Sequence, residues 1–208
     1  MSKAKGSEQQ GILIILSAPS GCGKTTIVDR LLKRHPDWSR SISATTRPPR
    51  TGEKKDEDYF FVDSAAFKGM EERGELLESA KVFDYFYGTP KQFITDSLKK
   101  GKTLVLAIDV QGMRKIKKVL EGRVPLCTIF VLPPSIKVLR DRLEGRKTDS
   151  LEEIERRITA AQEEIKDARL YDFTVMNKNL EQTVLEIEGF VSQKKKERRT
   201  ENHAIRSS

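Results

Sequence analysis

Cysteine and long hydrophobic runs are both scarce in this chain of 208 residues. Two cysteines, Cys22 and Cys127, cannot form a disulfide framework, and their spacing is not that of a metal site. The longest apolar run, 12–16, is far too short to cross a membrane, and residues 1–10 lack the apolar stretch of a secretory signal. These absences argue against a disulfide-rich secreted protein and against a membrane protein, so we expect a cytoplasmic one.

The composition is that of a globular chain long enough to bury a substantial core in one domain. Hydrophobic residues make up 37% and charged residues 34% of it. Half of the net charge of +8 comes from residues 193–208, where six basic side chains stand against two acidic ones. A solvated, flexible terminus is favoured over a nucleic-acid contact there, and residues 1–10 are expected to be flexible too.

Apolar patterning predicts alternating strands and helices. Runs rich in β-branched residues have the character of buried parallel strands, and an apolar period of 3.6 typical of helices follows them. The alternation predicts an α/β fold, with a parallel sheet between two layers of helices. The expected strands are 11–17, 103–108, 126–132 and, more weakly, 173–176, and the expected helices are 25–35, 112–120, 135–143 and 180–191.

Two segments interrupt this alternation. Residues 45–58 (TTRPPRTGEKKDED) are polar, contain two prolines and have almost no core residues. Residues 144–149 precede a highly charged helix in which Ser150 and Glu153 have the spacing of a capping box. Because that helix is polar nearly all round, we expect it to pack weakly and to form a moving lid.

The strongest local signal is the glycine-rich run APSGCGKT, residues 18–25, between a predicted strand and a predicted helix. This is the context of a phosphate-binding loop, in which backbone N–H groups and a helix N-terminus converge on phosphate oxygens. Lys24 is expected to reach the β- and γ-phosphates of ATP, and the Thr25 hydroxyl to ligate Mg²⁺. Loop amides would lower the pKa of a Cys22 thiolate, although a loop residue without a chemical role is the favoured interpretation.

Asp109 follows the strand 103–108, at the edge of the sheet where ligands of open α/β folds collect. A carboxylate there can hold magnesium through a water molecule. It can also cap the following helix, and both roles remain open.

Two fragments imitate the motifs of a GTPase. Residues 109–112 (DVQG) match DxxG, and residues 177–180 (NKNL) nearly match NKxD. Leu180 cannot accept the hydrogen bonds of guanine, and the DxxG lies more than eighty residues beyond the phosphate loop. We therefore reject a GTPase.

Several motifs in order make the chain resemble the guanylate kinase family over about residues 11–191. They are SAPSGCGKTT, SISATTRPPRTGE, KDEDYFFV, LLESAKVFDYFYGT, LAIDVQG and LEGRKTDSLEEIERR. The resemblance implies a P-loop nucleoside monophosphate kinase fold over 11–192, with a five-stranded parallel sheet, an inserted GMP-binding subdomain and a lid. Its expected bounds are about 11–44, 91–140 and 168–192 for the core, 45–90 for the GMP-binding subdomain and 141–167 for the lid.

The resemblance also assigns roles to particular positions. The arginines Arg146 and Arg157 match lid residues that reach the transferring phosphates and, with Lys24 and Arg47, form the expected catalytic set. The expected ATP-binding residues are Ala18, Pro19, Ser20, Gly21, Cys22, Gly23, Lys24, Thr25, Thr26 and Asn177, the last near the adenine. The expected GMP-binding residues are Ser43, Arg47, Arg50, Tyr59, Glu78, Tyr87, Thr89 and Asp109.

The chemistry of the side chains agrees with these roles. Two arginines beside prolines, Arg47 and Arg50, suit a dianionic phosphate. Guanine presents two adjacent donors, which the carboxylate of Glu78 accepts, whereas the acceptor N1 of adenine would be repelled. Each residue alone has an ordinary explanation, such as a solvated loop charge or core packing, and only their joint order favours GMP.

Two positions depart from the family pattern. Ala18 stands where the phosphate loop usually opens with glycine, and Ala107 stands in a segment that usually reads LDID. The second departure leaves Asp109 as the acidic group of that segment.

Two rival functions remain at this stage. Scaffold domains similar to guanylate kinases bind peptides, but they typically lose the phosphate loop, which is intact here. A phosphorylated ribose as acceptor would leave Glu78, Ser43 and Thr89 with no base to contact. We expect phosphorylation of GMP, and of dGMP, by ATP and magnesium in purine nucleotide metabolism.

Overall fold

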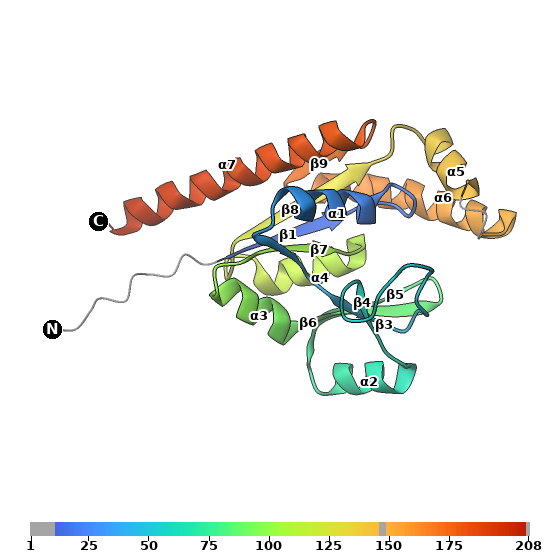
Figure 1. The fold of residues 1–208 in the computed structure, drawn as a ribbon, viewed down its shortest axis with the longest axis horizontal. Coiled ribbons are helices and arrows are strands. Elements are labelled where there is room, and N and C mark those ends of the chain that lie inside the picture. The colour runs from blue at the N-terminus through green and yellow to red at the C-terminus, as the bar shows by residue number, and fades with distance from the viewer. Residues whose placement is uncertain (1–10, 146–148, 207–208) are drawn as a thin grey trace. The chain divides into compact units, whose positions relative to one another are not determined.

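The computed structural model describes residues 11–145 and 149–206 (Figure 1). The chain divides into two compact units. Of the described residues, unit 1 contains 11–13 and 36–126, and unit 2 contains 14–35, 127–145 and 149–206. Each unit carries its own set of the residues expected to bind a nucleotide.

A five-stranded parallel sheet flanked by helices confirms the predicted α/β fold. Its strand order is β2-β7-β1-β8-β9. All four predicted strands are present, and β1 is buried throughout, as its apolar sequence predicts. The fifth strand, β2, has only three residues and was missed because so short a segment carries no periodicity. The bounds are β1 Ile12–Ser17, β2 Trp38–Arg40, β7 Thr103–Ala107, β8 Leu126–Leu132 and β9 Phe173–Met176.

Helices α1, α5, α6 and α7 belong to unit 2. Helix α1 packs against α7, and a bidentate ion pair joins them. Arg34 donates from Nε and Nη2 to the two carboxylate oxygens of Glu188 at 2.6 and 3.0 Å. Helix α7 also packs on β9, where the Phe173 and Phe190 rings stack with centroids 4.8 Å apart. The bounds are α1 Lys24–Arg34, α5 Ile136–Glu144, α6 Leu151–Lys166, the 3-10 turn η1 Asp167–Leu170 and α7 Leu180–Arg206.

Helix α7 extends well beyond its predicted end at residue 191, into the basic segment that the sequence suggested would be flexible. Side-chain pairs one helical turn apart stabilise this extension, among them Gln193 with Glu197 and Lys194 with Glu197. The sequence of this segment therefore favours a helix, although its charge had suggested a flexible terminus.

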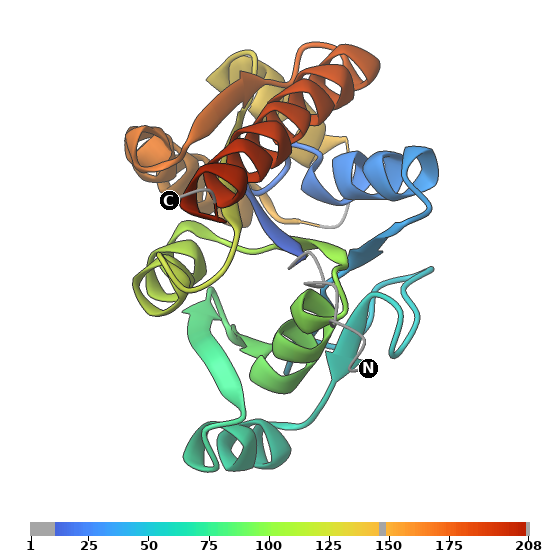
Figure 2. The same cartoon turned by 90° about the vertical axis from the view of Figure 1, so that its left-hand side faces the viewer.

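Unit 1 contains a second, mixed sheet with the strand order β4-β3-β6-β5. Strands β5 and β6 form an antiparallel hairpin, whose turn holds Phe83 at a φ of 53°. In the same unit α4 packs against β5 and α3 against β7 (Figure 2). The bounds are β3 Ser43–Thr45, β4 Tyr59–Phe61, α2 Ser64–Glu72, β5 Leu76–Val82, β6 Tyr85–Pro90, α3 Lys91–Lys99 and α4 Val110–Leu120.

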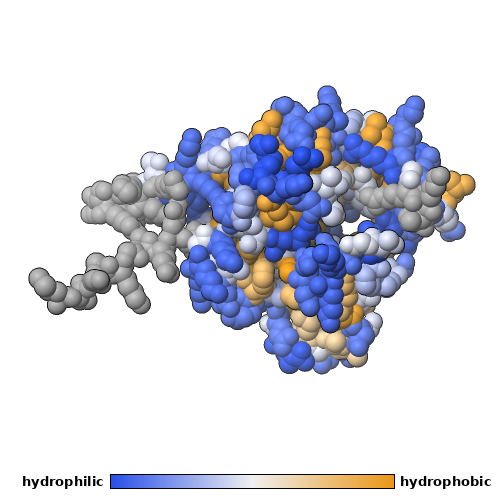
Figure 3. Space-filling view, in the orientation of Figure 1, coloured by the Kyte–Doolittle hydropathy of each residue, from blue (hydrophilic) through white to orange (hydrophobic). Residues whose placement is uncertain are grey.

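The face of the molecule in Figure 3 is mostly hydrophilic, and hydrophobic side chains reach it in small separate groups. In the part of the chain that the structure describes, no helix is both long and apolar enough to span a bilayer.

Candidate nucleotide-binding sites

The glycine-rich run forms a tight loop between β1 and α1 in unit 2. The Cys22 N–H donates to the Pro19 carbonyl at 3.2 Å, and Gly21 between them has a φ of +92°, the pattern of a type II turn. Gly23, with a φ of +86°, then caps the N-terminus of α1. Both positions require glycine, because other residues rarely adopt positive φ. The loop is thus preset by its sequence.

Polar groups line this loop. The Lys24 ammonium donates to the Ala18 carbonyl at 3.2 Å, and Thr25 and Thr26 are exposed in the first turn of α1. The N-terminal amides of α1 and the ammonium of Lys24 together favour an anion with several oxygens. This is the arrangement expected of a triphosphate site.

Cys22 does not fit the idea of an activated thiol. Its side chain is fully buried, and burial raises its pKa to about 12, although Lys24 and Arg142 act in the opposite direction. The alternative in which the loop amides lower this pKa is therefore wrong. Cys127 is buried in the same way, and its pKa is also raised to about 12.

Helix α6 brings one of the two expected lid arginines to the phosphate loop. Arg157 donates from Nη1 to the Ser20 hydroxyl at 2.9 Å and from Nε to Glu153 at 2.9 Å. Asp149 lies 3.5 Å from the same Nε. The other lid arginine, Arg146, lies outside the described residues.

The capping box predicted at the start of α6 is half confirmed, because the Ser150 hydroxyl accepts from the Glu153 N–H at 3.2 Å. The helix is less polar than its sequence suggests. Ile154, Ile158 and Ala161 bury an apolar stripe, and α5 packs against this helix. Its movement as a lid stays a prediction.

Asn177 follows β9 and is buried. Its side-chain Nδ2 donates to the Cys22 carbonyl at 2.8 Å, so the side chain contacts the backbone of the phosphate loop. The sequence placed Asn177 near an adenine; the contact with the loop was not foreseen.

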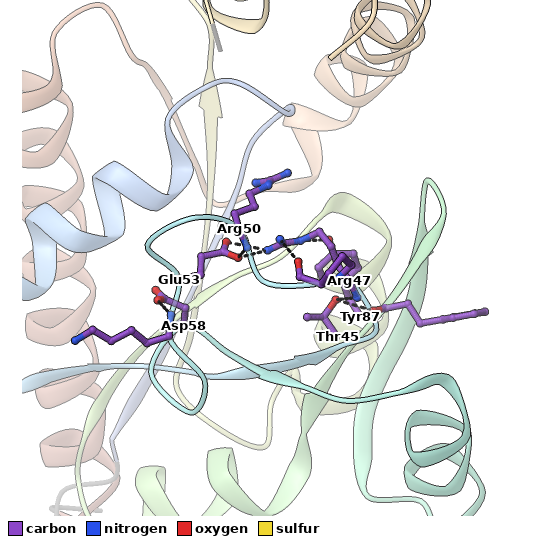
Figure 4. A network of polar contacts seen from close by, with 9 residues as sticks. Thr45, Arg47, Arg50, Glu53, Asp58 and Tyr87 are labelled. Carbon is purple, nitrogen blue, oxygen red and sulfur yellow. Dashed lines mark hydrogen bonds and ion pairs between the residues drawn. The ribbon is translucent and has the colours of Figure 1, made fainter. Parts of the chain in front are cut away.

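Unit 1 holds a network centred on Arg47, which is 8% exposed (Figure 4). Its Nε donates to the Tyr87 hydroxyl at 3.2 Å, Nη1 to the Pro48 carbonyl at 2.8 Å, and Nη2 to both oxygens of Glu53 at 2.8 and 2.9 Å. Glu53 also accepts from the backbone N–H of Arg50 at 2.7 Å. One carboxylate therefore ties together the two arginines expected to hold a phosphate.

The charges of this network reinforce one another. Burial alone would lower the pKa of Arg47 and raise that of Glu53, but their mutual hydrogen bonds and attraction outweigh it and shift both the other way. The aromatic rings of Tyr59 and Tyr87 meet edge to face with centroids 6.1 Å apart, and the Arg47 guanidinium lies 5.5 Å from the Tyr59 ring centroid. Burial raises the pKa of Tyr59, so its hydroxyl keeps the proton it would donate.

A second group of expected residues lies beside this network. Glu78 is 6% exposed and accepts from the Thr89 hydroxyl at 2.8 Å. The register of β5 against β6 shifts between Leu76 and Ser79, and such an irregularity re-aims the side chains it contains. Ser43 is also buried, on β3 of the same sheet.

The N-terminus of α4 closes the space around Glu78. Asp109 caps this helix, its Oδ1 accepting from the Gly112 N–H at 2.8 Å, so the capping role is present. A Cβ atom added at Gly112 would lie 3.0 Å from the Glu78 carboxylate, which shows how closely the helix approaches. Burial raises the pKa of Glu78 to about 7; the Thr89 hydrogen bond and Lys115 lower it, and Asp109 adds to the rise.

Sequence reasoning missed three residues of these sites. Glu53 belongs to the motif that contains Arg47, but nothing in its spacing indicates a partner. Gly112 was noted only as part of the LAIDVQG motif and of a chance DxxG. Arg142, which donates to the Asn177 carbonyl at 3.3 Å, follows the period of a surface helix. The contacts of Gly112 and Arg142 join segments far apart in the sequence, and the pairing of Glu53 with Arg47 depends on how one polar loop folds.

A parallel α/β sheet with a glycine-rich phosphate loop after its first strand defines a P-loop nucleotide-binding protein. The sequence model of the family described as guanylate kinase matches residues 10–194. Curated guanylate kinases from Clostridioides difficile and from the Wolbachia of Brugia malayi are 45% and 43% identical over 187 and 191 residues. Those alignments cover 90% and 92% of this chain, and 90% and 97% of the relatives.

The crystal structure of guanylate kinase from Anaplasma phagocytophilum matches this structure with a TM-score of 0.72 and 31% sequence identity. The match covers 89% of this chain and 86% of the Anaplasma chain. The chain belongs to the guanylate kinase family.

Proposed function

We propose that the protein transfers the γ-phosphoryl group of ATP to GMP, and to dGMP, as a step of purine nucleotide metabolism. The observation that carries this is a buried carboxylate, Glu78, beside a hydroxyl donor and an arginine network, in a chain that also has a complete phosphate loop. Membership of the guanylate kinase family supports the same reaction.

The GMP phosphate would bind at the Arg47 network. Arg47 and Arg50 supply positive charge, while Tyr59 and Tyr87 each supply a hydroxyl donor. Because the phosphate is already ionised, the acceptor needs no general base. Catalysis then depends on holding it in line with the γ-phosphate and on neutralising charge.

The guanine would bind at Glu78. An ionised carboxylate accepts from N1–H and N2–H₂ together, with Ser43 and Thr89 at other polar atoms of the base and Asp109 bordering the site. A contact of this kind discriminates between bases by about 1–3 kcal/mol, and by more where a mismatch leaves buried groups unpaired.

The triphosphate of ATP would bind in the loop of unit 2, with Lys24, Arg146 and Arg157 spread over the transferring group. Within the described residues, no three His, Cys, Asp or Glu side chains gather to hold a metal. The donors present instead suit Mg²⁺ that arrives on ATP and completes its shell with phosphate oxygens and water. The Thr25 hydroxyl would ligate it directly and Asp109 through water, and the ion would neutralise charge on the phosphates.

The test is an assay of ADP release with magnesium and ATP, using GMP, dGMP, IMP, AMP, CMP and UMP as acceptors. GMP and dGMP are expected to be used well and the pyrimidines poorly. Lys24→Met should stay folded and lose at least about a hundredfold in kcat, the cost of one preorganised electrostatic donor. A folded wild-type protein that does not consume GMP would contradict the proposal and favour a peptide-binding domain of the same fold.

A further inference from the structure

Asn177 joins three segments of unit 2 at one point. Its backbone N–H donates to the Leu132 carbonyl at the end of β8, at 2.9 Å, and its carbonyl accepts from Arg142 of α5 at 3.3 Å. Its side chain donates from Nδ2 to the Cys22 carbonyl in the phosphate loop at 2.8 Å. The residue is 6% exposed, and the hydrogen bond of its side chain to Cys22 is buried.

The contact with Cys22 fixes the orientation of one peptide group of the loop. In a planar trans peptide the carbonyl of Cys22 and the N–H of Gly23 point in opposite directions. The amide of Asn177 holds the carbonyl on its own side, so the Gly23 N–H is held on the opposite side of the loop. A phosphate needs that N–H, whereas a carbonyl turned toward it would repel its oxygens.

Close packing reinforces this orientation. A Cβ atom at Gly23 would lie 3.1 Å from Nδ2 of Asn177, so the side chain rests directly against the loop. On its other side Oδ1 of Asn177 lies 3.3 Å from the Thr183 hydroxyl, which also donates to the Asn179 carbonyl at 2.8 Å. The side chain is thus confined between the loop and the start of α7.

We propose that Asn177 is a positioning residue that sets the phosphate loop for the triphosphate, acting through the Cys22–Gly23 peptide rather than on the adenine. This inference rests on the proposed function of the loop. It predicts that the residue matters equally for any ligand with a triphosphate, whatever base is attached.

Inorganic triphosphate has no base, so it distinguishes a role of Asn177 in positioning the phosphate loop from a role in contacting the adenine. With magnesium present, Asn177→Ala should weaken ATP and inorganic triphosphate by the same factor, about ten- to hundredfold, and leave GMP affinity within about twofold. Binding is measured directly for ATP and GMP, and by competition with ATP for inorganic triphosphate. Asn177→Asp, which keeps the shape but loses the donor at neutral pH, should have the same pattern.

A matched control is Thr128→Val. Thr128 is fully buried on β8 and is joined to Asp172 at the start of β9 by hydrogen bonds of 2.8 to 2.9 Å, away from the loop. Its loss should lower the Tm comparably without changing the affinity for either phosphate ligand.

A loss of ATP affinity with unchanged triphosphate affinity would overturn the proposal and assign Asn177 to the adenine. Equal, small effects of Asn177→Ala and Thr128→Val on both ligands would reduce Asn177 to a stabilising residue, which also overturns it. If the wild-type protein bound neither ATP nor triphosphate, the proposed function would fail and this inference with it.

Discussion

At the scale of single residues, the proposed role of Glu78 in guanine recognition conflicts with the stability of the folded protein. A carboxylate at this depth prefers to be protonated, since burial raises its pKa to about 7. Guanine requires the ionised form, because only that form accepts two hydrogen bonds side by side. Lys115 of α4 and Thr89 of β6 favour ionisation, and Asp109 opposes it. The pKa of Glu78 is therefore close to neutral pH, where the carboxyl is only partly ionised.

The affinity for guanine should consequently fall as the pH decreases below about 7, the pKa of Glu78, by up to about tenfold per unit. Because the GMP phosphate also titrates, with a pKa near 6, guanosine is the better probe. Competition of guanosine with GMP, measured between pH 5.5 and 8.5, should follow this course. An inhibition constant for guanosine that is independent of pH would contradict it.

The same ionisation predicts a gain in stability for Glu78→Gln. The pKa of the Glu78 carboxyl is higher in the folded protein than in the unfolded chain, so the protonated form contributes stability at low pH. That contribution is lost as the pH rises through about 7, where the carboxyl ionises in the folded protein. At pH 8 the variant should therefore unfold with a free energy about 1–3 kcal/mol higher than wild type, and at pH 5 most of this advantage should be gone. Urea unfolding at the two pH values measures this, and a variant less stable at pH 8 would refute it.

Glu53 should act on GMP through the arginines it holds. Glu53→Gln removes a charged partner of Arg47, so we expect KM for GMP to rise about tenfold, with little change in KM for ATP. Steady-state kinetics with each substrate varied gives the result. Glu57→Gln is the control, since Glu57 is an exposed carboxylate of the same loop that pairs with Lys54 at the surface. A lower KM for GMP in Glu53→Gln would mean that Glu53 competes with the phosphate.

At the scale of elements, α6 is defined by two different faces. Its buried stripe packs in unit 2, where Arg140 of α5 also pairs with Glu155, and Arg157 extends from it to the phosphate loop. The predicted movement of α6 as a lid would carry Arg157 with it, as phosphoryl transfer in a closing site requires.

Arg157→Ala should therefore lower kcat by about a hundredfold while KM for GMP stays within about threefold. Arg156→Ala, one residue earlier on the same helix and paired with Glu153, is the matched control and should keep its activity. Turnover and circular dichroism of both variants decide the matter. Normal turnover without Arg157 would remove it from the catalytic set.

At the scale of the whole molecule, the two expected nucleotide sites belong to different compact units. The arginine network and Glu78 lie in unit 1, and the phosphate loop with Arg157 lies in unit 2. Each nucleotide should therefore stabilise the protein when the other is absent.

Thermal unfolding tests this division. GMP alone and MgATP alone, each at about a hundred times its Kd, should each stabilise the wild-type protein by about 2.7 kcal/mol. Lys24→Met should lose the MgATP effect and keep the GMP effect, and Glu78→Gln should do the reverse. A variant that lost both effects while folded would show that the sites are not separate.

The local elements were determined by the sequence itself. The buried strands, the phosphate loop with its two glycines at positive φ, and the Ser150 cap follow from hydrophobic periodicity and from backbone preferences, which act over a few residues. The order of the family motifs also predicted which residues form the two sites, because motif order can be read without coordinates.

Only the tertiary structure decided how those residues are held. Packing brings Arg47 to Glu53 and Asn177 to Cys22. It also buries Glu78, which raises the pKa of that carboxyl to about 7. Hydrogen-bond geometry and desolvation depend on distances in space. A sequence pattern specifies which groups are present, and the folded chain decides which of them meet.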